Sequence, residues 1–210
     1  MCCKFQVDRF VDFCFPGGIQ ESLRDQPNDL PTRAFWTVHN MKRLLELLTN
    51  FPGRFPYLHM PTFTFIESHD ELILAIIGIR AAYSNRTSQV QVRNLMQRTK
   101  YGIERTSSIY HNLVSGMHLR RGTPSGTEFQ ELQALLMLTT QFTWHGGPAD
   151  RATVQEESKR VFNFVKQHGP CCNSQVSAME LRALLTALQT ERLSVHHGGH
   201  GMPGLSKRSG

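Results

Sequence analysis

Histidine is the residue type with the most chemical potential in this sequence, and His59 has the most distinctive setting. It lies between Pro56 and Pro61, with the hydroxyl groups of Thr62 and Ser68 further along the sequence. A histidine that acts as a general base needs an acid or a nucleophile within hydrogen-bond distance. No nucleophile motif such as Gly-x-Ser-x-Gly accompanies His59. We therefore expect its ring nitrogens to satisfy buried backbone groups between helices, and we predict that the chain is not an enzyme.

A second group of histidines lies near the end of the sequence. His196, His197 and His200 could hold a metal ion in a helix, because residues i and i+4 share one helix face. Three interspersed glycines oppose helix formation, and no Glu stands between the histidines as in a zinc protease helix. We predict no metal site here and interpret residues 194–210 as a disordered, basic, Gly/His-rich tail.

The five cysteines indicate reduced thiols. They occur as Cys2-Cys3, Cys14 and Cys171-Cys172, without Cys-x-x-Cys spacing, and their odd number does not suit a closed disulfide framework. We expect no cofactor in this chain.

Length and composition are those of an ordinary globular domain. The chain has 210 residues, of which 40% are hydrophobic and 19% charged, and this length can bury a sizeable core. The longest apolar runs, residues 72–79 and 132–140, are shorter than the about 20 residues that a membrane-spanning helix needs. Asp8 and Asp12 interrupt the apolar start, so it is a poor secretory signal. We expect an intracellular protein without membrane contact.

Positive charge is concentrated in the middle of the chain. The net charge is +6, and Glu104 is the one acidic residue among the cations between residues 80 and 121. A basic stripe can approach phosphate. However, Arg93, Arg98 and Arg105 do not share one helix face, and no aromatic residues interleave at base-stacking spacing. We favour a solvated helix surface over direct contact with DNA.

Apolar residues recur at helical spacing along most of the chain, and no segment alternates as a strand would. Ser68 and Glu71 form a capping-box pattern, and Asp150 is a candidate N-cap. The sequence predicts an all-α, irregular bundle of about six or seven helices with flexible termini. The expected units are a loosely ordered lead-in (1–37), a helical domain (38–193) and the tail (194–210). The expected helices span residues 37–50, 68–84, 88–106, 108–119, 127–144, 150–168 and 177–193.

Two of these helices have clear inward faces. The expected core positions are Val92, Leu95, Met96, Thr99 and Ile103 in one helix, and Val154, Val161, Phe162 and Val165 in another.

An apolar stripe in the helix at 127–144 offers a candidate effector pocket. Its members are Leu136, Met137, Phe142 and Trp144, and helical regulatory domains do bind small molecules between helices. Ordinary core packing explains the same stripe, so both interpretations stay open.

The segment from Phe55 to Phe63 separates two apolar helical patterns. Its two prolines disfavour helix for themselves and for the residues before them, so the segment is expected to be extended. We predict that it locks the flanking helices together. The residues that define it are Phe55, Pro56, His59, Pro61, Thr62 and Phe63.

This segment and the apolar helix expected after it resemble the regulatory domain, or middle homology region, of fungal-specific transcription factors. The family has a Pro-x-x-His-x-Pro-Thr-Phe segment before an apolar helix that ends near Tyr-Ser. The matching positions of that helix here are Ala75, Gly78, Ala81, Tyr83 and Ser84. The run Leu132 to Leu138, the Gly146-Gly147 break and a helix up to His168-Gly169 come next, in the family's order. The resemblance covers residues 38 to 170.

The resemblance implies residence in the nucleus and control of transcription by RNA polymerase II. It implies that DNA binding and zinc belong to a zinc finger that this sequence lacks. It also implies contacts with the transcription machinery or co-regulators, a small-molecule effector and a homodimer. After Gly169 the family continues with a Trp-rich and Glu-Arg-Arg helix, which this chain replaces with a different sequence. We therefore expect a truncated domain.

Two other functions stay open. One is a free-standing helical module that binds protein partners without a transcriptional role. The other is a small helical enzyme with titratable groups converging around His59 or His145.

Overall fold

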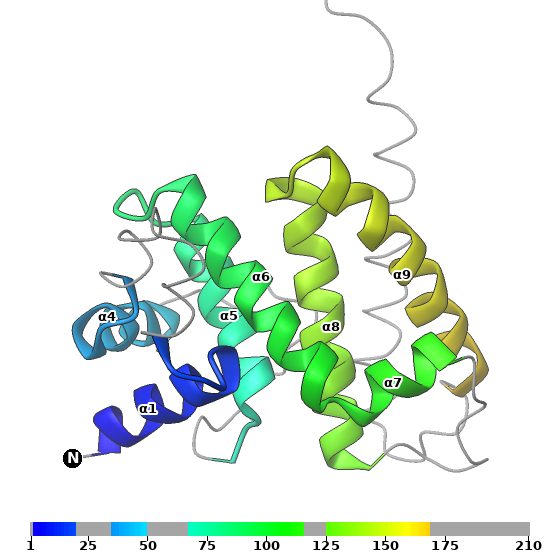
Figure 1. The fold of residues 1–210 in the computed structure, drawn as a ribbon, viewed down its shortest axis with the longest axis horizontal. Coiled ribbons are helices and arrows are strands. Elements are labelled where there is room, and N and C mark those ends of the chain that lie inside the picture. The colour runs from blue at the N-terminus through cyan, green and yellow to red at the C-terminus, as the bar shows by residue number, and fades with distance from the viewer. Residues whose placement is uncertain (1, 20–34, 50–66, 116–124, 169–210) are drawn as a thin grey trace, which may run out of the picture.

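The computed structural model describes residues 2–19, 35–49, 67–115 and 125–168, which form seven α-helices and no strands. This confirms the predicted all-α class. The helices, labelled as in Figure 1, are α1 (Cys2–Cys14), α4 (Val38–Thr49), α5 (Asp70–Ala82), α6 (Gln89–Thr106), α7 (Ser108–Ser115), α8 (Gly126–His145) and α9 (Pro148–His168).

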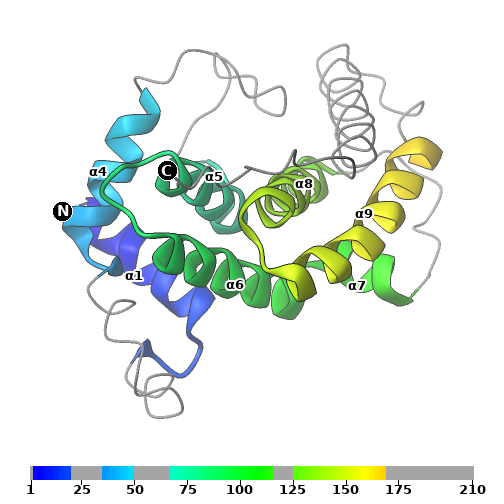
Figure 2. The same ribbon diagram turned by 90° about the horizontal axis from the view of Figure 1, so that it is seen from above.

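The centre of the fold is formed by α5 and α8. Ten of the 13 residues of α5 and 11 of the 20 residues of α8 are buried, as expected for helices that are apolar on most sides. Helix α6 packs against both of them. It buries Val92, Leu95, Met96, Thr99 and Ile103, which confirms its predicted inward face. Figures 1 and 2 show α1 and α4 on one side of this centre and α9 on the other.

Helix α1 differs from the loosely ordered lead-in that we expected over residues 1–37. Val7, Phe10, Phe13 and Cys14 recur at helical spacing and are buried, whereas Asp8 and Asp12 face solvent. The aspartates that argue against a secretory signal thus form the polar face of an amphipathic helix.

Contacts from α6 hold the end of α1. A guanidinium nitrogen of Arg105 donates to the backbone oxygen of Phe13 at 2.9 Å, which satisfies a carbonyl that has no partner within the helix. The Phe13 ring lies directly against Gly102, where a Cβ atom would collide with it. Just after α1, the Phe15 ring packs edge to face against Trp36, with 5.3 Å between the ring centroids.

Three predicted helix starts are wrong in detail. Helix α5 begins after His69 without a side-chain cap, so the Ser68–Glu71 capping box does not form. The capping box of α8 uses Ser125 and Glu128, and the helix begins before the predicted start at residue 127. Helix α9 begins at Pro148, which suits a first helical position. Asp150 lies inside its first turn and accepts from the Gly147 N–H at 2.8 Å.

Several predictions lie outside the described residues. These are the segment from Phe55 to Phe63, the helix at 177–193 and the tail at 194–210. In α9, Val154 and Val161 are buried as predicted, whereas the side chains of Phe162 and Val165 are not described.

Candidate functional site

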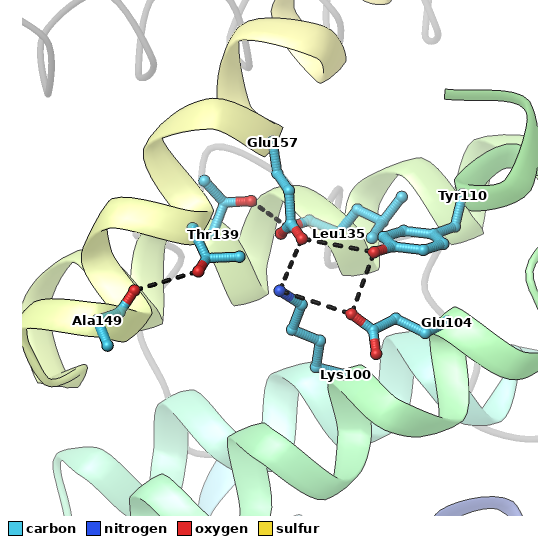
Figure 3. Close-up of polar contacts among 8 residues, drawn as sticks. Lys100, Glu104, Tyr110, Leu135, Thr139, Ala149 and Glu157 are labelled. Carbon is cyan, nitrogen blue, oxygen red and sulfur yellow. Dashed lines mark hydrogen bonds and ion pairs between the residues drawn. The ribbon is translucent and has the colours of Figure 1, made fainter. Parts of the chain in front are cut away.

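Four polar side chains from three helices meet in one network, shown in Figure 3. The Lys100 ammonium lies 2.7 Å from Glu157 Oε1 and 3.6 Å from Glu104 Oε1. The Tyr110 hydroxyl lies 3.1 Å from Glu104 Oε1 and 3.4 Å from Glu157 Oε1. The network therefore joins α6, α7 and α9 through one cation, two carboxylates and one phenol.

The local sequence positions each member. Lys100 and Glu104 are four residues apart on α6 and so share one face. Glu157 lies between the buried residues Val154 and Val161 of α9, which bring it toward α6. The Lys100 ammonium also lies 5.8 Å from the centre of the Phe142 ring, within cation–π range.

Tyr110 is positioned by a buried carboxylate on α8. Glu131 Oε2 accepts from the Ser107 hydroxyl at 2.6 Å and from the Ile109 N–H at 3.2 Å. The Ser107 hydroxyl oxygen in turn accepts from the Tyr110 N–H at 3.1 Å. Because the first N–H groups of a helix have no partners within it, Glu131 and Ser107 together satisfy the start of α7.

Tyr110 is a hydrogen-bond donor in this network. Burial, together with the negative charges of Glu104 and Glu157, raises the pKa of Tyr110 above its usual range. The phenol is protonated at neutral pH even at its ordinary pKa, and its one proton is shared between the two carboxylates. Lys100 offsets one of the two negative charges. The arrangement fits a polar connection between helices better than a proton-transfer centre, because its members satisfy one another.

A second ion pair joins α6 and α9. Arg93 Nε on α6 lies 4.0 Å from Asp150 Oδ2 on α9. Arg93 and Lys100 are seven residues apart, as are their partners Asp150 and Glu157. Two turns of helix separate seven residues, so the cations of α6 match the acids of α9 in register.

We predicted that the basic middle of the chain is a solvated helix surface. In the structure, several of its cations instead make contacts within the fold. Lys100 pairs with α9, Arg105 binds the end of α1, and the Arg98 guanidinium lies 4.9 Å from the centre of the Phe15 ring. These cations hold helices together.

The structure separates the residues of the candidate effector pocket. Leu136, Met137 and Phe142 are buried in the core, whereas Trp144 is 65% exposed at the end of α8. The pocket stays a prediction. The segment with Phe55, Pro56, His59, Pro61, Thr62 and Phe63 lies outside the described residues.

The network was not predicted from the sequence. The spacing of Lys100 and Glu104 is visible in the sequence, but Tyr110 and Glu157 join them only through the packing of α7 and α9.

The described ranges contain no group of three or more His, Cys, Asp or Glu side chains that could hold a metal ion. The described residues therefore offer no ligand set for the zinc that the resemblance implies. No helix in the described part of the chain is long and apolar enough to cross a bilayer.

Comparison with known protein families, with curated proteins and with solved structures gave no match.

Proposed function

We propose that this chain is a regulatory domain of a fungal transcription factor, which controls transcription by RNA polymerase II through protein contacts or an effector response. In this proposal the complete protein works in the nucleus, and its zinc finger supplies DNA binding. The direct partners of the domain are the transcription machinery or co-regulators, and a homodimer and a small-molecule effector are part of the proposal.

One observation carries the proposal. The two described apolar segments of the resemblance are α5 and the run 132–138 of α8, and these two helices pack against each other at the centre of the fold. Gly78, one of the positions that match the family, faces Gln141 so closely that a Cβ atom would collide with its side-chain oxygen. The resemblance therefore involves residues with a shared packing role.

A free-standing helical binding module is the second candidate. It is favoured by the exposed apolar side chains at the helix ends, because large apolar side chains in solvent are common at protein contact sites. Such a module would bind partners without changing transcription.

A reporter assay separates the two candidates. The full chain is fused to an unrelated DNA-binding domain, and the output of a reporter gene is measured in a fungal host. The control is Leu74→Asp, which places a carboxylate at a fully buried position and should unfold the domain. Immunoblots and circular dichroism establish that the chain is expressed and that its helices melt cooperatively.

We expect the folded chain to raise or lower reporter output and Leu74→Asp to lose the effect. An unchanged output from a chain that is expressed and melts cooperatively would contradict the transcriptional role and favour the binding module.

A further inference from the structure

The three most exposed large apolar side chains of the described residues lie at helix ends that flank the α5–α6 and α8–α9 connections. Tyr83 is 75% exposed at the end of α5, Val90 is 68% exposed in the first turn of α6, and Trp144 is 65% exposed at the end of α8. Trp and Tyr are the residues that most often dominate binding energy at protein interfaces. Their exposure therefore needs an explanation.

These residues lie at one end of the bundle. Figure 1 shows the α5–α6 and α8–α9 connections at the same upper end, and Figure 2 looks down on them. The ion pair between Arg93 and Asp150 joins the start of α6 to the start of α9. We call this end of the bundle the upper face. Its exposed residues in the two connections or in the adjoining helix turns include Tyr83, Arg86, Val90, Trp144 and Arg151.

The upper face is positively charged. Arg86 and Arg151 are exposed, and among the described residues no acidic side chain forms an ion pair with either. Asp150, the residue before Arg151, is half-buried and engaged by Arg93 and by the Gly147 N–H. A partner at this end of the bundle therefore meets cations that lack an acidic partner within the described part of the chain, as well as exposed aromatic and aliphatic side chains.

We propose that the upper face is a docking surface for an acidic peptide segment of a protein partner, one that carries apolar side chains among its carboxylates. The carboxylates pair with Arg86 and Arg151, and the apolar side chains cover Tyr83, Val90 and Trp144. This inference rests on the proposed function, because it assigns a surface and a partner chemistry to a domain that acts through protein contacts.

Charge and composition favour this occupant over two others. A second copy that docked through the same face would bring like charges together, which is unfavourable. A single-stranded nucleic acid would need successive aromatic side chains for base stacking, whereas Val90 is aliphatic. An acidic, apolar peptide matches both the charge and the side chains of the upper face.

The test uses the full chain and a fluorescein-labelled peptide of about 16 residues in which Asp and Glu alternate with Leu and Phe. Binding is measured by fluorescence anisotropy. We expect saturable binding that weakens as salt is added, because exposed charges are screened. We also expect a blue shift of tryptophan emission that disappears in Trp144→Phe, because Trp36 is already buried.

Matched variants locate the binding surface. Arg86→Glu/Arg151→Glu and Trp144→Ser should each weaken binding about tenfold or more. The controls are Arg160→Glu and Val114→Ser, which change an exposed cation on α9 and an exposed apolar residue on α7. They should leave the affinity within about twofold. Circular dichroism establishes that every variant folds.

Three results would overturn the inference: no saturable binding, an equal loss of affinity in the controls, or a preference for a labelled oligothymidine of equal length over the peptide. The reporter assay distinguishes this failure from that of the proposed function. A chain that changes reporter output without binding the peptide refutes the surface alone. A chain that binds the peptide but leaves the reporter unchanged refutes the transcriptional role alone.

Discussion

Replacement of Gly78 by Ala tests the central packing of α5 against α8. Alanine normally stabilises a helix interior relative to glycine by about 1 kcal/mol. At this position, however, the three atoms nearest to an added Cβ all belong to the Gln141 side chain, and the side-chain oxygen is in collision range. Gln141 is 3% exposed, so its side chain cannot turn out into solvent.

The cost follows from the hydrogen bond that Gln141 makes. Its amide nitrogen donates to the Ala75 backbone oxygen at 2.8 Å, and a Gln141 that moves aside loses this bond. A lost buried hydrogen bond costs about 1–3 kcal/mol, and an extra methyl group in a packed core costs about 1–3 kcal/mol. After the gain in helix propensity, Gly78→Ala should lower the free energy of unfolding by about 1–3 kcal/mol.

The sign should reverse when Gln141 is shortened. Outside the backbone of α5 itself and the two residues next to Gly78, no atom other than those of Gln141 lies closer than 3.4 Å to the added Cβ, which is ordinary van der Waals contact. In a Gln141→Ala background, Gly78→Ala should therefore stabilise by up to about 1 kcal/mol. The four chains form a double-mutant cycle, measured by urea unfolding with circular dichroism.

Gly126→Ala is the matched control, because this glycine also lies in a helix but has open space around it. It should leave stability unchanged or raise it slightly. If Gly78→Ala stabilised the otherwise unchanged chain as Gly126→Ala does, the close approach of α5 and α8 at Gln141 would be refuted.

Three further perturbations test the network and the buried ionisable groups. Lys100→Met leaves Glu104 and Glu157 without their cation and should destabilise by about 1–3 kcal/mol in urea unfolding, and adding Glu157→Leu should recover much of this; no recovery would contradict the pairing. Burial raises the pKa of Glu71 above its ordinary value of 4.5, so its contribution to stability is fully present below that value and is lost as pH rises through the folded-state pKa. Glu71→Gln should therefore stabilise more at about pH 7 than at about pH 4 in paired unfolding measurements. An equal effect at both pH values would count against the raised pKa of Glu71. Burial also raises the pKa of the Cys14 thiol. In a chain whose other four cysteines are replaced by Ser, Cys14 should therefore react with an aromatic disulfide reagent only when urea unfolds the chain. Rapid reaction without urea would mean that α1 is not docked.

The sequence was sufficient to predict the helices whose apolar pattern is long and regular. The inward face of α6 was predicted correctly because Val92, Leu95 and Met96 repeat at helical spacing. Helix starts were less predictable, since several residues near each start can serve as a cap. At α8, both Ser125 and Thr127 have a suitable partner three residues later, and the structure uses Ser125.

Helix α1 was missed because its acidic residues were weighed against a secretory signal and not placed on a helix. The spacing of Phe10 and Phe13 contained the information. The contacts that hold α1 were not predictable in the same way, because Arg105 and Gly102 are about 90 residues away in the sequence. Which glycine meets an aromatic ring depends on the packing of the whole bundle.

The matched spacing on α6 and α9 changes the meaning of the net positive charge. In the sequence, Arg93 and Lys100 belong to a basic stretch with one acid. In the fold, Asp150 and Glu157 oppose them with the same seven-residue spacing, so these two cations connect helices. Arg98 and Arg105 are likewise engaged by Phe15 and the end of α1.

Cations that make contacts within the fold are less available to bind phosphate groups of a nucleic acid. At the upper face, Arg86 and Arg151 supply exposed positive charge at the same end of the bundle as the exposed rings of Tyr83 and Trp144. Few charges beside large apolar groups suit a peptide that brings both carboxylates and apolar side chains. A nucleic acid would instead need a continuous row of cations along its backbone. The net charge of +6 is therefore no direct measure of the charge offered to a partner, because Arg93, Arg98, Lys100 and Arg105 make contacts within the fold.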